Sequence, residues 1–226
     1  MDFAYNDEQK EIIKVVRDLV EKEIVPYASE MDETGKLHEG LLEKLAAQGL
    51  LGVAIPEEFG GAGLDAITIA AIYEELGKGC AGVATTVAAN ALASYPVIIA
   101  GNDDQKKRYF DIINEDNLAA FALTEPGTGS DAGSVSTRAM KTEDGKGYIL
   151  NGTKCFITNG ALAEVFVVFA NTRKSGGIRG LTAFIVRKGT PGFTVGKAEN
   201  KMGIRASNTT ELIFQDCFVP VEDRLG

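Results

Sequence analysis

The hydrophobic period of this 226-residue chain changes from helical to alternating near residue 118, and no linker or low-complexity segment marks the change. Before it, apolar residues recur every three or four positions; after it they alternate, and turn dipeptides follow at short intervals. The pattern predicts an α+β chain, with an all-α helical domain over 1–117 followed by an antiparallel β-barrel or sandwich over 118–226. Without a linker, we expect the two domains to pack against each other.

The first domain should contain five helices. Asn6 and Gln9 can form a capping box for a helix that ends at Pro26, and Asp65 can cap another. The segment from Val83 to Tyr95 is nearly all apolar or small, which predicts a helix buried on every side. The two remaining helices are expected over 41–49 and 103–115.

The second domain should contain short strands, because β-branched and aromatic residues alternate with polar ones between turns. Asp144-Gly145 predicts a turn, and the pairs Asn151-Gly152 and Asn159-Gly160 favour two-residue hairpins. The expected strands are 118–124, 134–142, 147–152, 154–158, 164–170, 181–188 and 210–219.

Composition narrows the classes of function. A net charge of −9 disfavours binding to nucleic acid or to an anionic membrane, and no apolar run is expected to reach membrane-spanning length, so a small-molecule ligand is favoured. Three widely spaced cysteines and a single histidine, His38, predict reduced thiols and no metal site. The N-terminal residues lack the layout of a signal or transit peptide, which predicts a cytoplasmic protein.

The stretch Gly127-Thr-Gly-Ser-Asp-Ala132 has the form of a dinucleotide-binding fingerprint. A Rossmann site requires a helix directly after the glycines, whereas 134–142 alternates and predicts a strand. The stretch can still hold a phosphate, because successive backbone N–H groups can form an anion-binding nest. These groups belong to Gly127, Gly129, Ser130 and Asp131.

Two other interpretations of the stretch remain open at this point. The Pro-Gly-Thr-Gly sequence is also typical of a plain wide β-turn. Glu125 and Asp131 could form a carboxylate pair for acid–base catalysis, as in a glycosidase. The absence of tryptophan from the sequence disfavours a sugar site.

Several motifs together resemble the flavin-dependent acyl-CoA dehydrogenases. They are "ALTEPGTGSD" from Ala122, "YILNGTKCFITNG" from Tyr148, "KMGIR" from Lys201 and "FQDCFVP" from Phe214. "AIPEEFGGAG" and "IIAGNDDQKKRY" extend the similarity into the first half, so it covers the whole chain. The family's helical domain followed by a β-barrel agrees with the hydrophobic periods.

The resemblance implies FAD as the cofactor and a set of residues that bind it: Phe121, Leu123, Thr124, Gly129, Ser130, Phe156, Ile157 and Thr158. The first three would face the pyrimidine edge of the flavin, Ser130 the pyrophosphate, Phe156 one flavin face and Thr158 the flavin N5. Ser130 and Ser175 are also implied to contact the acyl-CoA.

Two departures from the family pattern stand out. Thr128 occupies a position where the family usually has a smaller residue, and we expect no loss of function from it. The sequence ends at "VPVEDRLG", where family members continue into a second helical domain that carries a glutamate base. We therefore assign no catalytic residue, expect the base beyond residue 226, and do not take Glu125 as a substitute. By itself the chain is expected to be inactive.

The activity implied is α,β-dehydrogenation of an acyl-CoA thioester to trans-2-enoyl-CoA, in fatty-acid or amino-acid catabolism. An electron-transferring flavoprotein would accept the electrons, and the intact protein would be a homodimer or homotetramer. An acyl-CoA oxidase on the same scaffold and a non-catalytic flavin- or acyl-CoA-binding module are the alternatives. Small residues along 83–99 permit a straight acyl chain, and Ala84 disfavours a dicarboxylic one.

Overall fold

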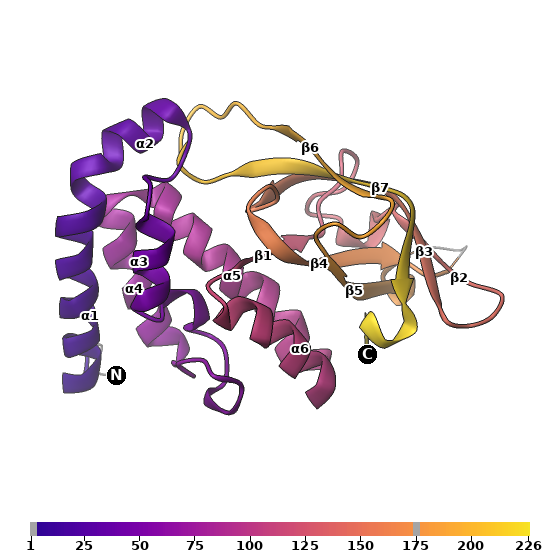
Figure 1. Ribbon diagram of the computed structural model, residues 1–226, viewed down its shortest axis with the longest axis horizontal. Helices are drawn as coiled ribbons and strands as arrows, with labels where there is room; N and C mark the ends of the chain where they lie inside the picture. Colours follow the sequence, from indigo (N-terminus) through magenta and orange to yellow (C-terminus); the bar gives the residue numbers. More distant parts are fainter. Residues whose placement is uncertain (1–3, 174–176) are drawn as a thin grey trace.

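The computed structural model describes residues 4–173 and 177–226, in which a helical region precedes a β-sheet region (Figure 1). Helix α5 lies between the outer helices and the sheet, next to strand β1 (Figure 1). The predicted order of a helical and a mainly antiparallel β part is confirmed. The α-helices are α1 (Asp7–Leu19), α2 (Ala28–Thr34), α3 (Leu41–Ala47), α4 (Ala66–Gly79), α5 (Ala81–Ala100) and α6 (Asp103–Asn114).

Helix α1 begins at the predicted capping box. The Asn6 side chain accepts a hydrogen bond from the Gln9 N–H at 2.8 Å, and the Gln9 side chain accepts one from the Asn6 N–H at 3.1 Å. The expected end at Pro26 is wrong, because the chain continues through a π-helical turn (Val20–Ile24) and a 3₁₀ turn (Val25–Tyr27) into α2. Pro26 lies at the start of the 3₁₀ turn, where the N–H that proline lacks would have no helical hydrogen-bond acceptor.

Helix α5 corrects two expectations. It is not buried on every side, because Leu92, Tyr95 and Ile99 are 48%, 41% and 81% exposed and form a stripe along one face. It is also, among the described residues, the helix that is long and apolar enough to cross a membrane by length and composition. Half of its apolar window is buried within the protein, and a core helix of a soluble protein passes the same test.

The strands form one eight-stranded sheet in the order β6-β7-β3-β2-β4-β5-β8, with β1 paired to β4. Most pairs are antiparallel, while β1 and β2 each pair with β4 in parallel. The sequence did not predict β6 or β8. The strands are β1 (Leu118–Ala122), β2 (Arg138–Lys141), β3 (Gly147–Thr158), β4 (Ala163–Asn171), β5 (Leu181–Arg187), β6 (Phe193–Ala198), β7 (Thr209–Pro220) and β8 (Arg224–Leu225).

Strand β3 joins two strands that the sequence separated at Asn151-Gly152. No hairpin forms there, because β3 runs on against β7 through two irregularities of register. The Asn151 side-chain amide donates a hydrogen bond to the Asp216 carboxylate at 3.1 Å, and the Asn151 side-chain oxygen accepts one from the Asp216 backbone N–H at 2.9 Å. Glycine is required at position 152 because the backbone there approaches Thr137 closely, and not because the chain turns. A Cβ atom on residue 152 would lie 2.4 Å from Thr137 Oγ1.

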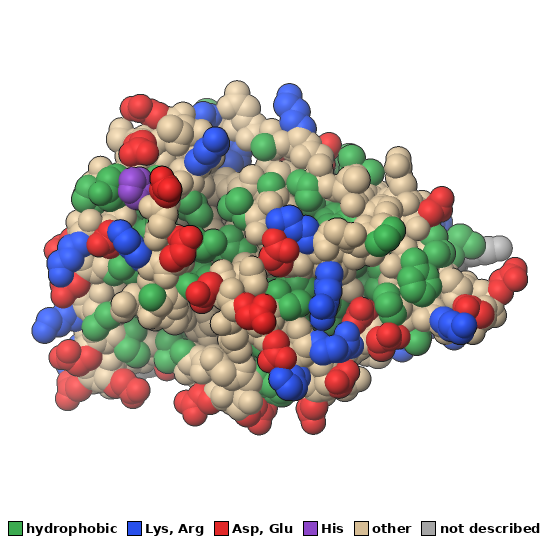
Figure 2. All heavy atoms as spheres, in the orientation of Figure 1, with side chains coloured by type: hydrophobic (Ala, Val, Ile, Leu, Met, Phe, Trp, Pro, Cys, Tyr) green, Lys and Arg blue, Asp and Glu red, His purple; other side chains and the backbone are tan. Residues whose placement is uncertain are grey.

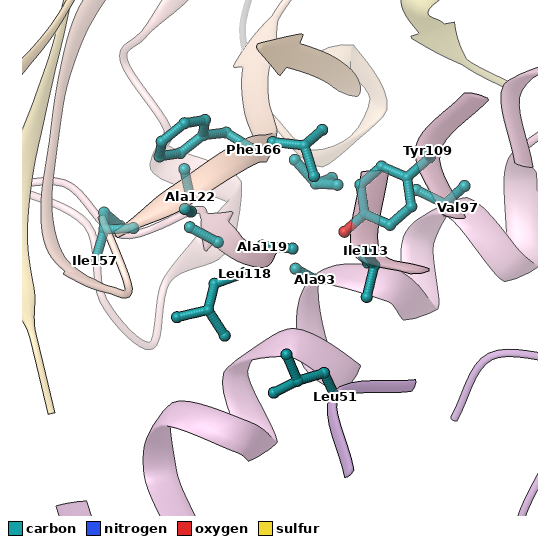
Figure 3. Packing of buried hydrophobic residues seen from close by; sticks show 14 of the residues in the cluster. Leu51, Ala93, Val97, Tyr109, Ile113, Leu118, Ala119, Ala122, Ile157 and Phe166 are labelled. Carbon is teal, nitrogen blue, oxygen red and sulfur yellow. The ribbon is translucent and has the colours of Figure 1, made fainter. Parts of the chain in front are cut away.

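The helical and sheet regions share one apolar core. Figure 3 shows Val97 of α5 and Tyr109 and Ile113 of α6 packed beside Leu118 of β1 and Phe166 of β4. All five are buried. The packing expected from the missing linker is therefore present, and it sets α5 against β1.

Charged side chains cover the surface without a large patch of one sign on the face shown in Figure 2, where Lys and Arg are interspersed with Asp and Glu. This distribution and the net charge of −9 disfavour binding of a polyanion along that face.

Candidate functional site

A pocket of about 420 Å³, here called the α5 pocket, opens between α5 and the ends of β1 and β3. It brings together five of the predicted cofactor residues, which are far apart in the sequence. Its lining is largely apolar, as a site for a planar aromatic ligand requires. The lining residues are Thr85, Ala88, Ala89, Leu92, Phe121, Thr124, Phe156, Ile157 and Thr158.

Phe156 owes its position in the α5 pocket to a bulge in β3. The register with β7 shifts between Lys154 and Ile157, and Phe156 takes the left-handed backbone conformation with φ of 56°. Lys154, Cys155 and Ile157 are buried, whereas Phe156 is 64% exposed. The bulge therefore turns the Phe156 ring out of the sheet into the pocket.

Two hydroxyl groups in the α5 pocket are available to a ligand. Among the described residues, the Thr124 and Thr158 hydroxyls have no hydrogen-bond partner, although both residues line the pocket. The Thr85 hydroxyl instead donates to the Ala81 carbonyl at 2.8 Å. The pocket thus combines apolar walls with two free polar groups near β1 and β3.

No helix of a Rossmann type follows the glycine stretch. Glu125 and Thr128 close a tight turn by two backbone hydrogen bonds of 3.0 Å, and only a 3₁₀ turn (Ala132–Ser134) precedes β2. The β-turn interpretation thus holds for 125–128. The hydroxyl of Thr128 donates to the Ser134 carbonyl at 2.9 Å, so this departure from the family pattern helps to close the loop.

The donors needed for a phosphate nest are present in this loop. Within the described part of the chain, no acceptor pairs with the backbone N–H groups of Gly127, Gly129, Ser130 and Asp131. Gly129 and Ser130 are exposed in the loop and do not line the α5 pocket, and neither does the half-buried Leu123. These three predicted residues thus lie outside the lining of the α5 pocket.

Glu125 is buried and cannot form the proposed acid–base pair with Asp131. Its carboxylate accepts hydrogen bonds from the Lys154 ammonium at 2.7 Å and from the N–H groups of Ser136 and Thr137 at 2.7 and 3.0 Å. Burial pushes the pKa of Glu125 upward, but these donors outweigh burial and lower it to about 2. Glu125 is therefore an ionised structural carboxylate.

Lys154 is a residue that the sequence reasoning missed. The sequence "KCFIT" predicts an ordinary strand residue at position 154, yet the Lys154 side chain is fully buried. A signal was available in the sequence: a lysine inside an apolar strand requires an acidic partner, and Glu125 of "TEPG" is an acidic residue in the neighbouring motif.

A larger pocket of about 650 Å³, here called the arginine pocket, adjoins the α5 pocket, and Leu92 and Phe121 line both. Arg173, Arg179 and Arg224 line it, and among the described residues none of these guanidinium groups has an Asp or Glu partner. Ser175, the second predicted substrate residue, lies outside the described residues.

The described residues contain no group of three or more His, Cys, Asp or Glu side chains that could hold a metal ion. Cys155 and Cys217 are buried and Cys80 is half-buried, and burial raises the pKa of Cys217 to about 11. His38 stacks on Tyr27 with ring centroids 3.6 Å apart, away from both pockets.

Family models match both parts of the chain. The model described as "Acyl-CoA dehydrogenase, N-terminal domain" matches residues 6–114, and "Acyl-CoA dehydrogenase, middle domain" matches residues 120–217. The chain belongs to the acyl-CoA dehydrogenase family. Members of this family are FAD-dependent.

Individual acyl-CoA dehydrogenase relatives agree with the family models. The chain is 44% identical to an acyl-CoA dehydrogenase of Bacillus subtilis (strain 168) over 97% of its length and 58% of that protein. It matches the structure of butyryl-CoA dehydrogenase from Megasphaera elsdenii with a TM-score of 0.93 and 44% identity, over 100% of this chain and 60% of that one.

A further solved structure concerns an electron-transferring flavoprotein. A chain in the structure described as the electron transferring flavoprotein of Acidaminococcus fermentans matches with a TM-score of 0.94 and 42% identity, over 100% of this chain and 60% of that one. The present chain thus spans about 60% of the length of each of these three relatives.

Proposed function

We propose that this protein takes part in the FAD-dependent α,β-dehydrogenation of acyl-CoA thioesters to trans-2-enoyl-CoA. The observation that carries the proposal is the α5 pocket, where Thr124 of the first motif and Phe156 and Thr158 of the second meet against α5. The family match and the butyryl-CoA dehydrogenase structure support the same activity.

The described residues fit a flavin ring. When bound, FAD supplies the acceptor for the hydride that leaves the β-carbon of the acyl group. Phe156 provides an aromatic wall for one face of the ring, and the Thr124 and Thr158 hydroxyls are the groups placed to hydrogen-bond its polar edge and N5 region. Fixed donors at that edge favour the reduced ring, because negative charge gathers there on reduction.

The glycine loop fits the pyrophosphate of the same cofactor. Among the described residues, the N–H groups of Gly127, Gly129 and Ser130 have no acceptor, and with the Ser130 hydroxyl they form a set of donors on one exposed loop. Because the loop is fixed to β3 through Glu125 and Lys154, its position relative to Phe156 is set by the fold.

The acyl-CoA is proposed to lie along the exposed face of α5. Ala88 and Leu92 provide a narrow apolar wall for a straight acyl chain. Arg179 and Arg224, which have no Asp or Glu partner among the described residues, provide positive charge for the CoA phosphates. The α5 pocket contains no carboxylate, so no described residue is assigned as the base that removes the α-proton.

Three further parts of the proposal concern the whole protein. An electron-transferring flavoprotein is proposed as the electron acceptor, in keeping with the structure of that description among the matches. A homodimer or homotetramer in the cytoplasm, acting in fatty-acid or amino-acid catabolism, is proposed from the family resemblance. The domain division at 117/118 is likewise proposed, and it falls between α6 and β1.

The proposal is tested by titrating the whole protein, including any residues beyond Gly226, with FAD and then adding acyl-CoA esters from butyryl-CoA to palmitoyl-CoA without oxygen. FAD should bind with quenching of its fluorescence, and Thr158→Ala and Ser130→Ala should weaken binding. Bleaching of the flavin absorbance by an acyl-CoA would establish dehydrogenation, whereas binding of FAD without bleaching would indicate a binding module. Rapid reoxidation in air would contradict the dehydrogenase assignment and favour an oxidase.

A further inference from the structure

Lys154 lies fully buried in the middle of β3, although lysine is among the residues least often buried. Its ammonium donates to the Leu123 carbonyl at 3.1 Å and to Glu125 Oε1 at 2.7 Å. Both partners belong to the segment that follows β1. Lys154 therefore connects two parts of the chain that are separate in the sequence.

The backbone next to Lys154 makes a further connection between the same two segments. The Cys155 N–H donates to the Thr124 carbonyl at 2.9 Å, so residues 123–125 are each bonded to β3 at 154 or 155. Phe156 follows immediately in its left-handed conformation. The three bonds thus end where the bulge turns the ring into the α5 pocket.

Glu125 extends the connection to the glycine loop. Its second oxygen accepts hydrogen bonds from the Ser136 N–H and hydroxyl at 2.7 and 2.5 Å, and the first also accepts from the Thr137 N–H at 3.0 Å. Since Glu125 stands before the loop and Ser136 after it, the carboxylate holds both ends of 126–135 together. Its own position depends on the Lys154 ammonium.

We propose that Lys154 is a positioning residue for the flavin, which fixes the segment 123–125, the bulge at Phe156 and the ends of the glycine loop as one rigid unit. This inference rests on the proposed function, because it concerns the same cofactor site. Lys154 itself does not line the α5 pocket, so its effect on the flavin passes through the Leu123 and Thr124 backbone and through Glu125.

A purely structural role would be different: Lys154 would serve only to neutralise a buried carboxylate. Removing both charges would then restore all properties, because a buried ion pair can often be replaced by neutral groups without loss of stability. A positioning role requires the ammonium's bond to the Leu123 carbonyl as well, and a neutral pair does not restore that bond.

The test compares Lys154→Met and the double variant Lys154→Met/Glu125→Gln with the wild-type protein. The matched control is Lys188→Met, because Lys188 and Glu164 form an ion pair of the same 2.7 Å length with both side chains 43% exposed. Three quantities are measured: thermal stability, the Kd for FAD, and hydrogen exchange of the backbone over 123–137 and 155–158 without FAD.

We expect Lys154→Met to lower stability, to weaken FAD binding about tenfold or more, and to speed exchange in both segments. The double variant removes the uncompensated carboxylate and should regain part of the stability. Its amide has only one acceptor oxygen for the Ser136 and Thr137 donors, so it should regain neither the FAD affinity nor the slow exchange. Lys188→Met should leave the Kd for FAD within about twofold of wild type.

Full recovery of FAD affinity and slow exchange in the double variant would overturn the inference and leave a purely structural ion pair. The inference is also overturned if Lys154→Met binds FAD as the wild type does. If the wild-type protein retains no FAD, the proposed function fails; unchanged exchange in Lys154→Met would then reject the inference separately, because that measurement uses no cofactor.

Discussion

Asn90 of α5 and Asn159 at the end of β3 bind the same residue of β1. The Asn90 side-chain oxygen accepts a hydrogen bond from the Ala119 N–H at 2.5 Å, and the Asn159 side-chain amide donates to the Ala119 carbonyl at 3.2 Å. Both side chains are fully buried. The parallel strand β1 is thus fixed by side chains from a helix and from the turn after β3, at the boundary between the two regions.

The first prediction concerns Asn159→Gly. Glycine accepts the left-handed backbone of Asn159, whose φ is 64°, so the change removes the amide without adding strain. The Ala119 and Thr86 carbonyls lose a buried donor, which should lower the free energy of unfolding by about 1–3 kcal/mol. Urea unfolding measures the loss. The exposed loop variant Asn200→Gly is the control, and an equal loss there would contradict a special role for Asn159.

The second prediction concerns pH. Hydrogen bonds from Arg17, at 2.8 and 3.0 Å, are the main cause that lowers the pKa of the buried Glu75 to about 2. Glu75 therefore stabilises the fold fully above its unfolded pKa of about 4.5, and this contribution is lost as pH falls towards 2. The contribution is below about 3 kcal/mol, because the Arg17 side chain is half exposed.

The pH prediction is checked by the unfolding free energy of Glu75→Gln and wild type between about pH 6 and pH 3. The variant should be less stable at the upper end, and the difference should shrink as the medium becomes more acidic. Glu74→Gln, on the exposed neighbour that also pairs with Lys78, should follow the wild-type curve. A difference that stays constant with pH would disprove the assignment.

The third prediction separates the backbone of Phe156 from its ring. Phe156→Ile puts a β-branched residue at φ of 56° and should cost about 1–3 kcal/mol of stability, whereas Phe156→Asn should cost little. Both remove the aromatic wall, so both should weaken FAD binding to a similar degree. Retained FAD affinity in Phe156→Asn would show that the ring does not contact the flavin.

The fourth prediction concerns the arginine pocket. Arg179→Ala should weaken the binding of butyryl-CoA by about three- to tenfold and reduce its dependence on salt, because one cation near the CoA phosphates is lost. Calorimetry at two ionic strengths measures both effects. The exposed Lys197→Ala, which lines neither pocket, is the control. Equal salt dependence in Arg179→Ala and wild type would remove this pocket from the CoA site.

The sequence predicted the architecture because the two hydrophobic periods are long and uninterrupted, and it predicted the cofactor residues only through the resemblance to a family. The α5 pocket brings Phe121, Thr124, Phe156, Ile157 and Thr158 together, although their roles stay predictions. The Rossmann fingerprint was rejected correctly, because its test is local: a helix must follow the glycines, and a strand pattern followed them instead.

The errors arose where distant parts of the chain decide the local structure. Asn151-Gly152 has the composition of a hairpin, but pairing with β7 and contact with Thr137 keep it inside β3. Lys154 looks like an ordinary strand residue until the bulge and Glu125 are known. The exposed face of α5 consists of apolar residues, so hydrophobicity alone could not distinguish it from a core face.

The pairing of β3 with β7 also has a consequence for how the protein matures on the ribosome. The helices precede the sheet in the chain and can pack early. The bulge around Phe156, in contrast, gains its partner strand only when residues 209–220 have emerged. A nascent chain that pauses before β7 would be helical but unable to recognise FAD. We therefore expect cofactor loading to be a late event in biosynthesis, set by the order of strands along the chain.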